Sequence, residues 1–280
     1  MLNNGMSEEC AVAPSNSSDW VVVTVTYNSA DQLATHWARS DLRDGCWIVV
    51  DNGSSDRSVE VAESLGARVI RAPRNGGFSY GNNLGLAASE SKYVGFVNPD
   101  AAVSSSDLMK LQGHIEQFGG LVAPQLTYPD GTIQPNGRGL PTIWAKLLHR
   151  LVPGFGGYRR VAALGESVGV SWAMGAAVFG ERRVFEDVGN WSEDFFLYYE
   201  DAEIGLRAWA TGVPVTVCGS TRVVHEWGRA TSRFRWSAWK RELAAARVFY
   251  AKFPRLLLPS VVSGRRFRAF EELSQRCCHD

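Results

Sequence analysis

Residues 20–28 of the chain read WVVVTVTYN, and residues 47–53 read WIVVDNG. Each segment is a run rich in β-branched residues that ends in residues favouring a turn, as expected of a short buried strand. Stretches with helical character separate such runs in the first part of the chain. This alternation is typical of βαβ units that build a mainly parallel sheet, so the two segments predict an α/β fold.

The same alternation continues up to Asp100. We expect helices at about 30–40 and 56–65 and strands at 67–72 and 93–97, with the glycine-rich segment 75–81 and a further helix between those two strands. In open α/β sheets, ligands bind beyond the carboxyl ends of the strands. Four polar residues stand at or just past predicted strand ends, namely Asn28, Asp51, Asn75 and Asp100. We therefore expect a binding site at this edge of the sheet.

The second half of the chain is less regular. Turn signals occur at 129–131 and 135–137, and the stretch 153–160, rich in Gly, Pro and basic residues, is interpreted as a mobile loop. The segment SWAMGAAVF at 171–179 predicts a strand or a strand and turn, and DAEIGLRAWAT at 201–211 predicts an amphipathic helix. Because no internal repeat is visible, we expect one α/β domain with a C-terminal helical tail.

Composition limits the possible functions. The chain has 280 residues, of which 45% are hydrophobic and 21% charged, as suits a folded protein with a sizeable core. Lys+Arg and Asp+Glu each number 29, so no net field attracts nucleic acid, and no nucleic-acid partner is expected. No run approaches the roughly 18 to 20 apolar residues that span a bilayer.

The two ends of the chain and its cysteines complete this survey. Residues 1–19 are polar and contain no apolar run, which argues against a signal peptide and predicts a disordered lead-in to a domain at 20–253, followed by a tail at 254–280. The five cysteines have no CxxC spacing, so neither a disulfide framework nor a zinc site is indicated. A reducing cytoplasm is the simplest setting.

Several motifs allow both a structural and a functional interpretation. In DNGSSD at 51–56, Asp51 either caps a turn and helix or accepts hydrogen bonds from a nucleoside. The loop RNGGFSYGNN at 74–83 is either a plain turn or a phosphate-binding helix start, and it is neither a Walker loop nor a GxGxxG motif. The NPD sequence at 98–100 is either a turn or a source of oxygen ligands for Mg²⁺ or Mn²⁺.

Two later positions are equally open when each is taken alone. Asp201 follows Glu200 at the start of the predicted helix, where it is either a helix-capping residue or a general base. His225 follows an apolar run and is either structural or a metal ligand.

Taken in order, these motifs resemble those of glycosyltransferase family 2, and within it the bacterial rhamnosyltransferase-like members. The matching segments are TYN at 26–28, VVDNGSSD at 49–56, RNGGFSYGNN at 74–83, NPD at 98–100, YYEDAEIGLRA at 198–208 and HEWG at 225–228. The resemblance implies a GT-A fold and a single displacement with inversion at the anomeric carbon. It also implies that the domain at 20–253 is the catalytic unit.

The resemblance also assigns roles to individual residues. For the donor it implies nucleoside contacts from Thr26, Tyr27, Asn28 and Asp51, diphosphate and ribose contacts from Gly76, Gly77 and Asn82, and a metal site at Asp100 and His225. Asn98 replaces the first carboxylate of the family's DxD motif and would hydrogen-bond to the ribose or a water. For the acceptor it implies Asp201 as base, with Glu200, Glu203, Trp172, Met174 and Gly175 forming the pocket.

The function that follows is transfer of a sugar from a dTDP- or UDP-sugar, with dTDP-rhamnose as the expected donor, to a glycan or lipid-linked sugar in cell-envelope polysaccharide synthesis. The cofactor implied is Mg²⁺ or Mn²⁺. The basic and aromatic stretch 229–252 either covers the sheet as a solvated helix or contacts an anionic membrane or an acceptor pyrophosphate. We expect a cytoplasmic protein that can lie at the inner face of the cell membrane.

Two other functions are compatible with parts of the sequence. A sugar-phosphate nucleotidyltransferase would share the nucleotide-binding sheet, but TYNSAD at 26–31 stands where its glycine-rich, basic loop is expected. A non-catalytic sugar-nucleotide-binding protein has support only from Asn98. Asp100, Asp201 and His225 together argue against it.

Overall fold

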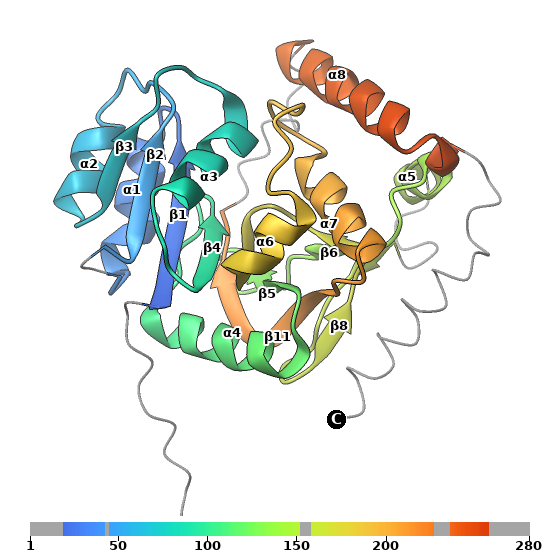
Figure 1. Cartoon of the computed structure of the whole chain (residues 1–280), viewed down its shortest axis with the longest axis horizontal. Coiled ribbons are helices and arrows are strands. Elements are labelled where there is room, and N and C mark those ends of the chain that lie inside the picture. Colours follow the sequence, from blue (N-terminus) through green and yellow to red (C-terminus); the bar gives the residue numbers. More distant parts are fainter. Residues whose placement is uncertain (1–18, 43–44, 152–157, 227–235, 258–280) are drawn as a thin grey trace, which may run out of the picture.

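The β-branched run identified first in the sequence forms β1 (Trp20–Thr26), which lies between two parallel neighbours. On one side are β2 (Trp47–Asp51) and then β3 (Arg68–Arg71), and on the other side is β4 (Tyr93–Val97). The computed structural model describes residues 19–42, 45–151, 158–226 and 236–257. These four strands form the N-terminal half of the sheet and are all parallel, in agreement with the mainly parallel sheet that the sequence predicts (Figure 1).

Four further strands of mixed direction extend the sheet. In the described residues it has eight strands, in the order β3-β2-β1-β4-β10-β5-β11-β8. The added strands are β5 (Leu121–Thr127), β8 (Ser167–Gly169), β10 (Ala177–Glu181) and β11 (Val215–Val224). β10 is antiparallel to both β4 and β5, whereas β5 and β11 are parallel. A separate small sheet contains β6 (Gly137–Arg138), β7 (Arg159–Arg160) and β9 (Trp172–Ala173).

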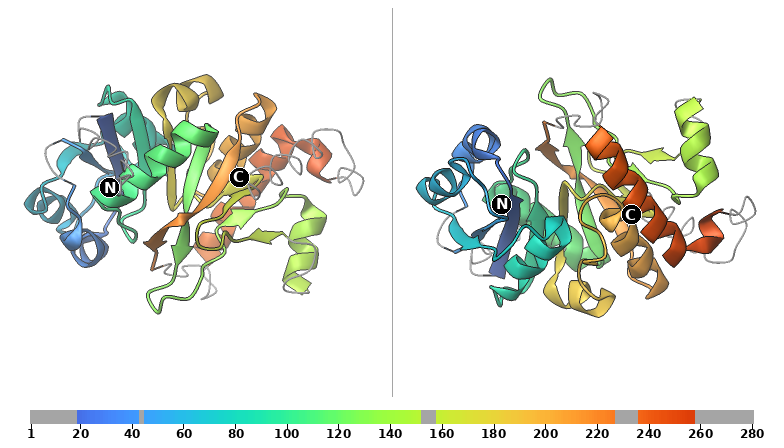
Figure 2. Two further views of the ribbon diagram at one scale, coloured as in Figure 1. Left: turned by 90° about the horizontal axis from the view of Figure 1, so that it is seen from below. Right: turned by 90° about the horizontal axis from the view of Figure 1, so that it is seen from above.

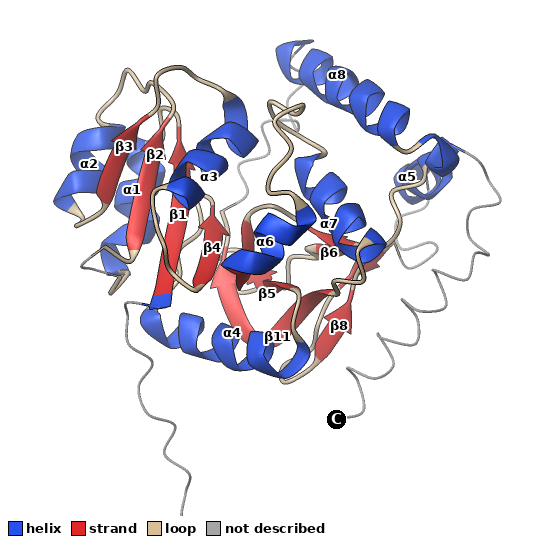
Figure 3. Cartoon of the chain, viewed as in Figure 1, coloured by secondary structure: helices blue, strands red, loops and turns tan. Residues whose placement is uncertain are grey.

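Helices cover both faces of the large sheet (Figure 3). The helical elements are α1 (Ala30–His36), η2 (Trp37–Arg39), α2 (Ser58–Ser64), α3 (Gly77–Ala87), α4 (Ser105–Phe118), α5 (Ile143–Leu151), α6 (Arg182–Val188), α7 (Glu200–Ala210), α8 (Trp236–Lys252) and η4 (Pro254–Leu257). Because strand side chains alternate, Val22 packs in one core cluster with Leu33 and Leu111, and Val23 packs in another with Leu86 and Ile204. The result is a layered α/β fold, as predicted.

The observed elements correct several details of the sequence prediction. The strands at 47–51 and 93–97 have the predicted bounds, while α3 begins at Gly77, inside the segment predicted to be a loop. The segment 171–179, predicted as a strand or as a strand and turn, contains β9 and the start of β10, separated by a turn. The loop prediction for 153–160 is wrong at its end, because Arg159 and Arg160 pair with β6; residues 152–157 lie outside the described residues.

The remaining predictions about the chain ends fall mostly on residues that the structure does not describe. The lead-in at 1–18 and the tail at 258–280 are among them, as are the first basic residues of the stretch 229–252. In the described part of that stretch, residues Trp236–Lys252 form α8, in agreement with the prediction of a C-terminal helix. None of the described helices is long and apolar enough to cross a membrane.

Candidate active site

A cavity of about 560 Å³ lies among the carboxyl end of β4, the turn after β9 and the start of α7, and it also reaches α5 and α8. The predicted residues that line it are Asn98, Asp100, Trp172, Met174, Gly175, Glu200, Asp201 and His225. They come from segments far apart in the sequence, so the fold brings the residues predicted as metal ligands, base and acceptor pocket around one cavity. Gln32, Phe78, Arg138, Lys146, Tyr198, Tyr199 and Glu242 also line it.

Asp100 and His225 are brought together by backbone pairing. Ala101 and His225 form an isolated antiparallel bridge, and the N–H group of Glu226 donates to the carbonyl of Asp100. As a result, Nε2 of His225 lies 3.4 Å from Oδ1 of Asp100. The other ring nitrogen, Nδ1, lies 2.7 Å from Oε1 of the buried Gln134.

These contacts decide how well the two residues suit a metal ion. With the Gln134 amide oxygen accepting from Nδ1, the lone pair of Nε2 faces the Asp100 carboxylate, the arrangement that metal-binding histidines adopt. No group of three His, Cys, Asp or Glu side chains suited to a metal occurs among the described residues. A donor set of one carboxylate and one imidazole still fits Mn²⁺ or Mg²⁺, since such ions in diphosphate sites take further oxygens from the substrate and from water.

Asp201 lies in the first turn of α7, and each of its carboxylate oxygens accepts a backbone hydrogen bond. Oδ1 accepts from Ala202 N at 2.8 Å, and Oδ2 accepts from Gly175 N at 3.2 Å. Burial raises the pKa of Asp201, while these two N–H groups and the nearby charges of Lys146 and Arg138 oppose that rise. The Asp201 carboxylate is therefore fixed in position by two hydrogen bonds, partly desolvated, and located at a cavity. These are the properties that a general base requires.

The two residues before α7 have unusual backbone conformations. Tyr198 and Tyr199 have φ values of 76° and 69°, in the left-handed region that non-glycine residues rarely occupy. Both residues line the cavity, and the next residue, Glu200, is buried with its Oε2 atom lacking a hydrogen-bond partner among the described residues. Burial and the neighbouring Asp201 raise the pKa of Glu200. Backbone strain of this kind often accompanies functional sites, because it fixes side chains in one geometry.

The predicted nucleoside contacts lie at the ends of β1 and β2, outside the lining of this cavity. Asp51 accepts from the N–H groups of Gly53 and Ser54, and Oδ1 of Asn28 accepts from Ser55 N at 2.8 Å. These contacts match the structural interpretation of DNGSSD as a capped turn. They also fix the turn at the sheet edge, beside Tyr27, whose side chain is 54% exposed.

The predicted diphosphate loop packs closely against the active-site region. Gly77 has a φ of 87°, and a Cβ atom there would overlap the backbone of Phe196. Phe78 N donates to Phe196 O at 3.0 Å, which joins the start of α3 to the segment before α7. At Gly76, the N-cap of α3, an added Cβ would meet only the side chain of Tyr80, so the close backbone approach requires glycine at Gly77 alone.

Several of the buried polar atoms without a hydrogen-bond partner lie near the same loop. Thr26 Oγ1, Asn52 Oδ1, Ser79 Oγ and Asn82 Nδ2 are buried and have no hydrogen-bond partner among the described residues. Buried polar groups usually pair, so four such atoms near the ends of β1 and β2 and in α3 call for an explanation. A polar ligand bound there with a small local adjustment would provide one.

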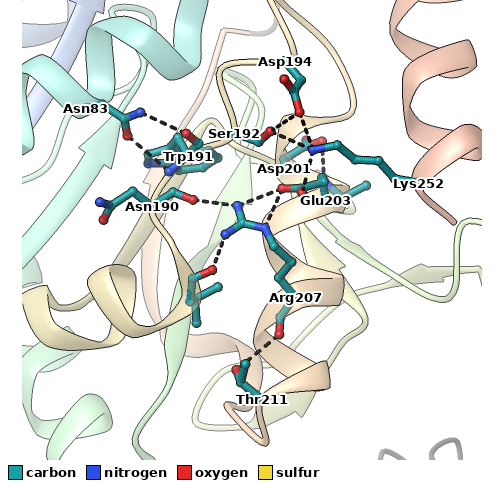
Figure 4. Close-up of polar contacts among 12 residues, drawn as sticks. Asn83, Asn190, Trp191, Ser192, Asp194, Asp201, Glu203, Arg207, Thr211 and Lys252 are labelled. Carbon is teal, nitrogen blue, oxygen red and sulfur yellow. Dashed lines mark hydrogen bonds and ion pairs between the residues drawn. The ribbon is translucent and has the colours of Figure 1, made fainter.

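Glu203 is the one predicted acceptor residue that the structure does not bring to the cavity lining. It is buried, and its Oε2 accepts from both Nε and Nη2 of Arg207 at 2.8 Å (Figure 4). Lys252 lies 3.4 Å from the other oxygen, and Arg207 also donates to the carbonyls of Val188 and Asn190. These contacts join α7 to α8 and to the end of α6, which is a structural role.

The sequence interpretation missed two basic residues that line the cavity, Arg138 on β6 and Lys146 on α5. Arg138 pairs in register with Trp172 of β9, which places it beside the predicted acceptor pocket. No motif marks either residue. The only available signal was the apolar spacing of IWAKLLHRL at 143–151, which indicates an amphipathic helix.

The sequence of the chain is similar to those of known glycosyltransferases. Residues 21–174 match the sequence profile described as Glycosyl transferase family 2. The chain is 25% identical over 237 residues to the N-acetylglucosaminyl-diphospho-decaprenol L-rhamnosyltransferase of Mycobacterium tuberculosis, with coverage of 76% of this chain and 77% of that protein.

Solved structures show the same fold at lower identity. The mannosyltransferase PcManGT of Pyrobaculum calidifontis, solved with GDP-Man and Mn²⁺, gives a TM-score of 0.56 at 15% identity, covering 93% of this chain and 70% of that one. GalNAc-T7, solved with UDP, GalNAc and Mn²⁺, gives a TM-score of 0.58 at 16% identity. The match covers 94% of this chain and 55% of that one. The chain therefore belongs to glycosyl transferase family 2 and has a GT-A fold.

Proposed function

We propose that this glycosyltransferase moves rhamnose from dTDP-rhamnose, with inversion, onto a sugar that is part of a glycan or linked to a polyprenyl diphosphate. The observation that supports it best is that Asp201, Asp100 and His225 line one cavity. A base, a metal site and an acceptor pocket in one space are what a single displacement requires.

The donor side of the reaction uses Asp100 and His225. They would hold Mn²⁺ or Mg²⁺, which when bound neutralises charge on the departing nucleoside diphosphate. Gln134 keeps the His225 ring oriented through its 2.7 Å contact with Nδ1. Asn98 would hydrogen-bond to the ribose or a water, and Gly76, Gly77 and Asn82 would lie beside the diphosphate.

The acceptor side uses Asp201. Its carboxylate takes the proton of the acceptor hydroxyl as the oxygen forms a bond to the anomeric carbon and the bond from that carbon to the diphosphate breaks. The N–H groups of Gly175 and Ala202 hold the carboxylate in place at 3.2 and 2.8 Å. Trp172 and Met174 would shape the acceptor pocket, and Glu200 would orient an acceptor hydroxyl.

The donor and acceptor classes rest on the M. tuberculosis relative, whose name specifies a rhamnosyl group and a sugar on diphospho-decaprenol. UDP-sugars are the next donors to consider, since GalNAc-T7 was solved with UDP. Thr26, Tyr27, Asn28 and Asp51 would contact the nucleoside. We further propose that residues 20–253 form the catalytic domain and that the enzyme works in the cytoplasm at the inner face of the membrane.

The test is a calorimetric titration with dTDP-rhamnose, UDP-glucose and UDP-galactose, each with and without Mn²⁺ or Mg²⁺, followed by a transfer assay. The proposal expects metal-dependent binding of dTDP-rhamnose and release of dTDP when acceptor is present. Binding of a UDP-sugar instead would overturn the donor assignment. Donor binding without any release of nucleoside diphosphate would indicate a non-catalytic binding protein.

A further inference from the structure

Arg138 and Lys146 line the cavity, and neither forms an ion pair with a carboxylate in the part of the chain that the structure describes. Basic side chains that are partly removed from water are normally paired. Two such cations facing one cavity therefore suggest that an anion binds between them.

Arg138 is fixed by its surroundings. Nη1 donates to the carbonyls of Pro135 and Gly137 at 2.6 and 2.9 Å, and Nη2 contacts Sδ of Met174 at 3.4 Å. Its guanidinium carbon lies 5.8 Å from the centre of the Trp172 ring. Since arginine has five N–H donors, these contacts leave donors free for a ligand, and a planar guanidinium suits phosphate oxygens.

Lys146, on α5, lines the same cavity. Its Nζ atom is 3.7 Å from the centre of the Tyr199 ring, and burial lowers the pKa of Lys146 to about 8. The nearby negative charges that raise this pKa belong to Asp201 and Glu242, and no ion pair with either is formed. A bound anion would supply the missing counter-charge.

The other side of α5 is apolar and exposed. Among the side chains that the structure describes there, Ile143, Trp144, Leu147, Leu148 and Leu151 are exposed, the last of them by 70%. The views of the molecule place α5 and α8 at the opposite end from β3 (Figures 1 and 2). One helix thus presents a cation to the cavity and an apolar surface next to it, which suits a ligand with an anionic group and a lipid chain.

We propose that Arg138 and Lys146 bind the diphosphate of a lipid-linked acceptor, so that its sugar reaches Asp201. This inference rests on the proposed function for the identity of the acceptor. The donor also contains a diphosphate, but Asp100 and His225 are expected to hold that group through a metal. The two diphosphates would then bind on different elements, one at the ends of β4 and β11 and the other on β6 and α5.

The first test measures binding of inorganic pyrophosphate by calorimetry in the presence of EDTA. Without a metal ion the donor site should bind pyrophosphate only weakly. The binding measured in EDTA therefore reports on Arg138 and Lys146. We expect Lys146→Met to weaken this binding about 10- to 100-fold, the cost of one charged phosphate contact. Lys110→Met, on the exposed face of α4, is the control and should bind like the wild type. Equal binding by Lys146→Met and wild type would overturn the proposal.

The second test compares two acceptors that carry the same sugar, one on a prenyl diphosphate and one on an uncharged alkyl group. For Lys146→Met we expect a KM about 10- to 100-fold higher for the diphosphate acceptor only, with the KM of the donor unchanged. Because the charge of Lys146 also lowers the pKa of Asp201, some loss of kcat on both acceptors is expected near the midpoint of the pH profile. A loss of kcat on both acceptors without the selective rise in KM would refute the acceptor subsite. Arg138→Gln, if it folds, should behave like Lys146→Met.

The two proposals can fail separately. If the wild-type protein transfers sugar to neither acceptor, the proposed function fails, while the pyrophosphate titration still tests the basic pair. If transfer occurs and the two acceptors respond equally to Lys146→Met, only the acceptor subsite is refuted.

Discussion

Oε1 of Gln134 lies 2.7 Å from Nδ1 of His225, and both side chains are buried. Gln134 follows β5, and its own N–H group donates to the carbonyl of Leu126 at 2.9 Å, so its position is fixed by the sheet. The Gln134 amide therefore holds the His225 ring at Nδ1, so that Nε2 on the other side of the ring faces Asp100. This contact leads to a prediction about metal affinity.

Replacing Gln134 with Leu should weaken binding of Mn²⁺ about 10- to 100-fold, because second-sphere hydrogen bonds hold metal-binding histidines in place. Calorimetry or the paramagnetic signal of Mn²⁺ would measure the change. Gln117→Leu, on the exposed side of α4, is the matched control. Unaltered Mn²⁺ affinity in Gln134→Leu would show that the orientation of His225 does not depend on this amide.

Asp201→Asn should fold and bind donor like the wild type but lose about 100- to 10,000-fold in kcat, since an amide cannot take the acceptor proton. Glu200→Gln is the informative comparison. Burial raises the pKa of Glu200, so this side chain is easily protonated and a neutral glutamine is a close substitute. A smaller loss is therefore expected there; an equal loss in both variants would argue against Asp201 as the base.

The raised pKa of Asp201 also predicts how transfer depends on pH. The base must be ionised, so kcat should fall on acidification, with a midpoint above the ordinary aspartate value of about 4. Lys146→Met removes a charge that lowers this pKa and should move the midpoint to higher pH. A midpoint that stays in place would mean that another group limits the acid side of the profile.

Arg207→Met should reduce the free energy of unfolding by about 3 kcal/mol, because it leaves the buried Glu203 carboxylate with only Lys252 as a distant partner. Arg57→Met removes a comparable pair with Glu60, but there both side chains are largely exposed. Arg57→Met, the control, should reduce the free energy of unfolding by about 0.5 kcal/mol or less. Urea denaturation measures both. Equal effects would mean that burial of Glu203 has little energetic consequence.

The parallel half of the fold could be predicted because β1, β2 and β4 are buried on both faces and so appear as unbroken apolar runs. The sequence did not predict β5, which contains Pro124, because proline is unfavourable in a central strand. In the structure, Pro124 lies past Val122, the last residue of β5 that pairs with β10. The start of α4 carried a usable signal, the capping box between Ser104 and Asp107.

The site was predictable only where its residues belong to short motifs. Asp100 and Asp201 stand beside recognisable segments, whereas Gln134 and Arg138 come from an irregular stretch whose position depends on strand pairing. Glu203 shows the opposite error. The EDAE sequence places Glu203 one helical turn from Glu200, but the partly buried Arg207, four residues later, determines the contacts of Glu203.

Acidification should destabilise the fold through His114. Burial lowers its pKa from 6.5 to about 4, and its ring nitrogens contact Thr216 and Ser167. The unfolded chain takes up the proton near pH 6.5 and the folded chain does not, so stability is complete above that pH and falls as pH decreases to about 4. The slope should approach about 1.4 kcal/mol per pH unit. Urea titrations of wild type and His114→Gln measure it, and an identical slope in the two would exclude His114 as the cause.

Gly77→Ala tests whether the close approach of the donor loop to the segment before α7 matters for binding. Gly77 and Gly131 have similar φ values, 87° and 80°, so alanine at either should cost about 1 to 2 kcal/mol in backbone strain. Only at Gly77 would the new Cβ also meet the backbone of Phe196, whereas nothing lies within 4 Å at Gly131. We therefore expect Gly77→Ala to lose more stability in urea and to bind donor more weakly, and Gly131→Ala to keep its donor affinity. If the two variants were equal in both measurements, the contact between α3 and Phe196 would be irrelevant to donor binding.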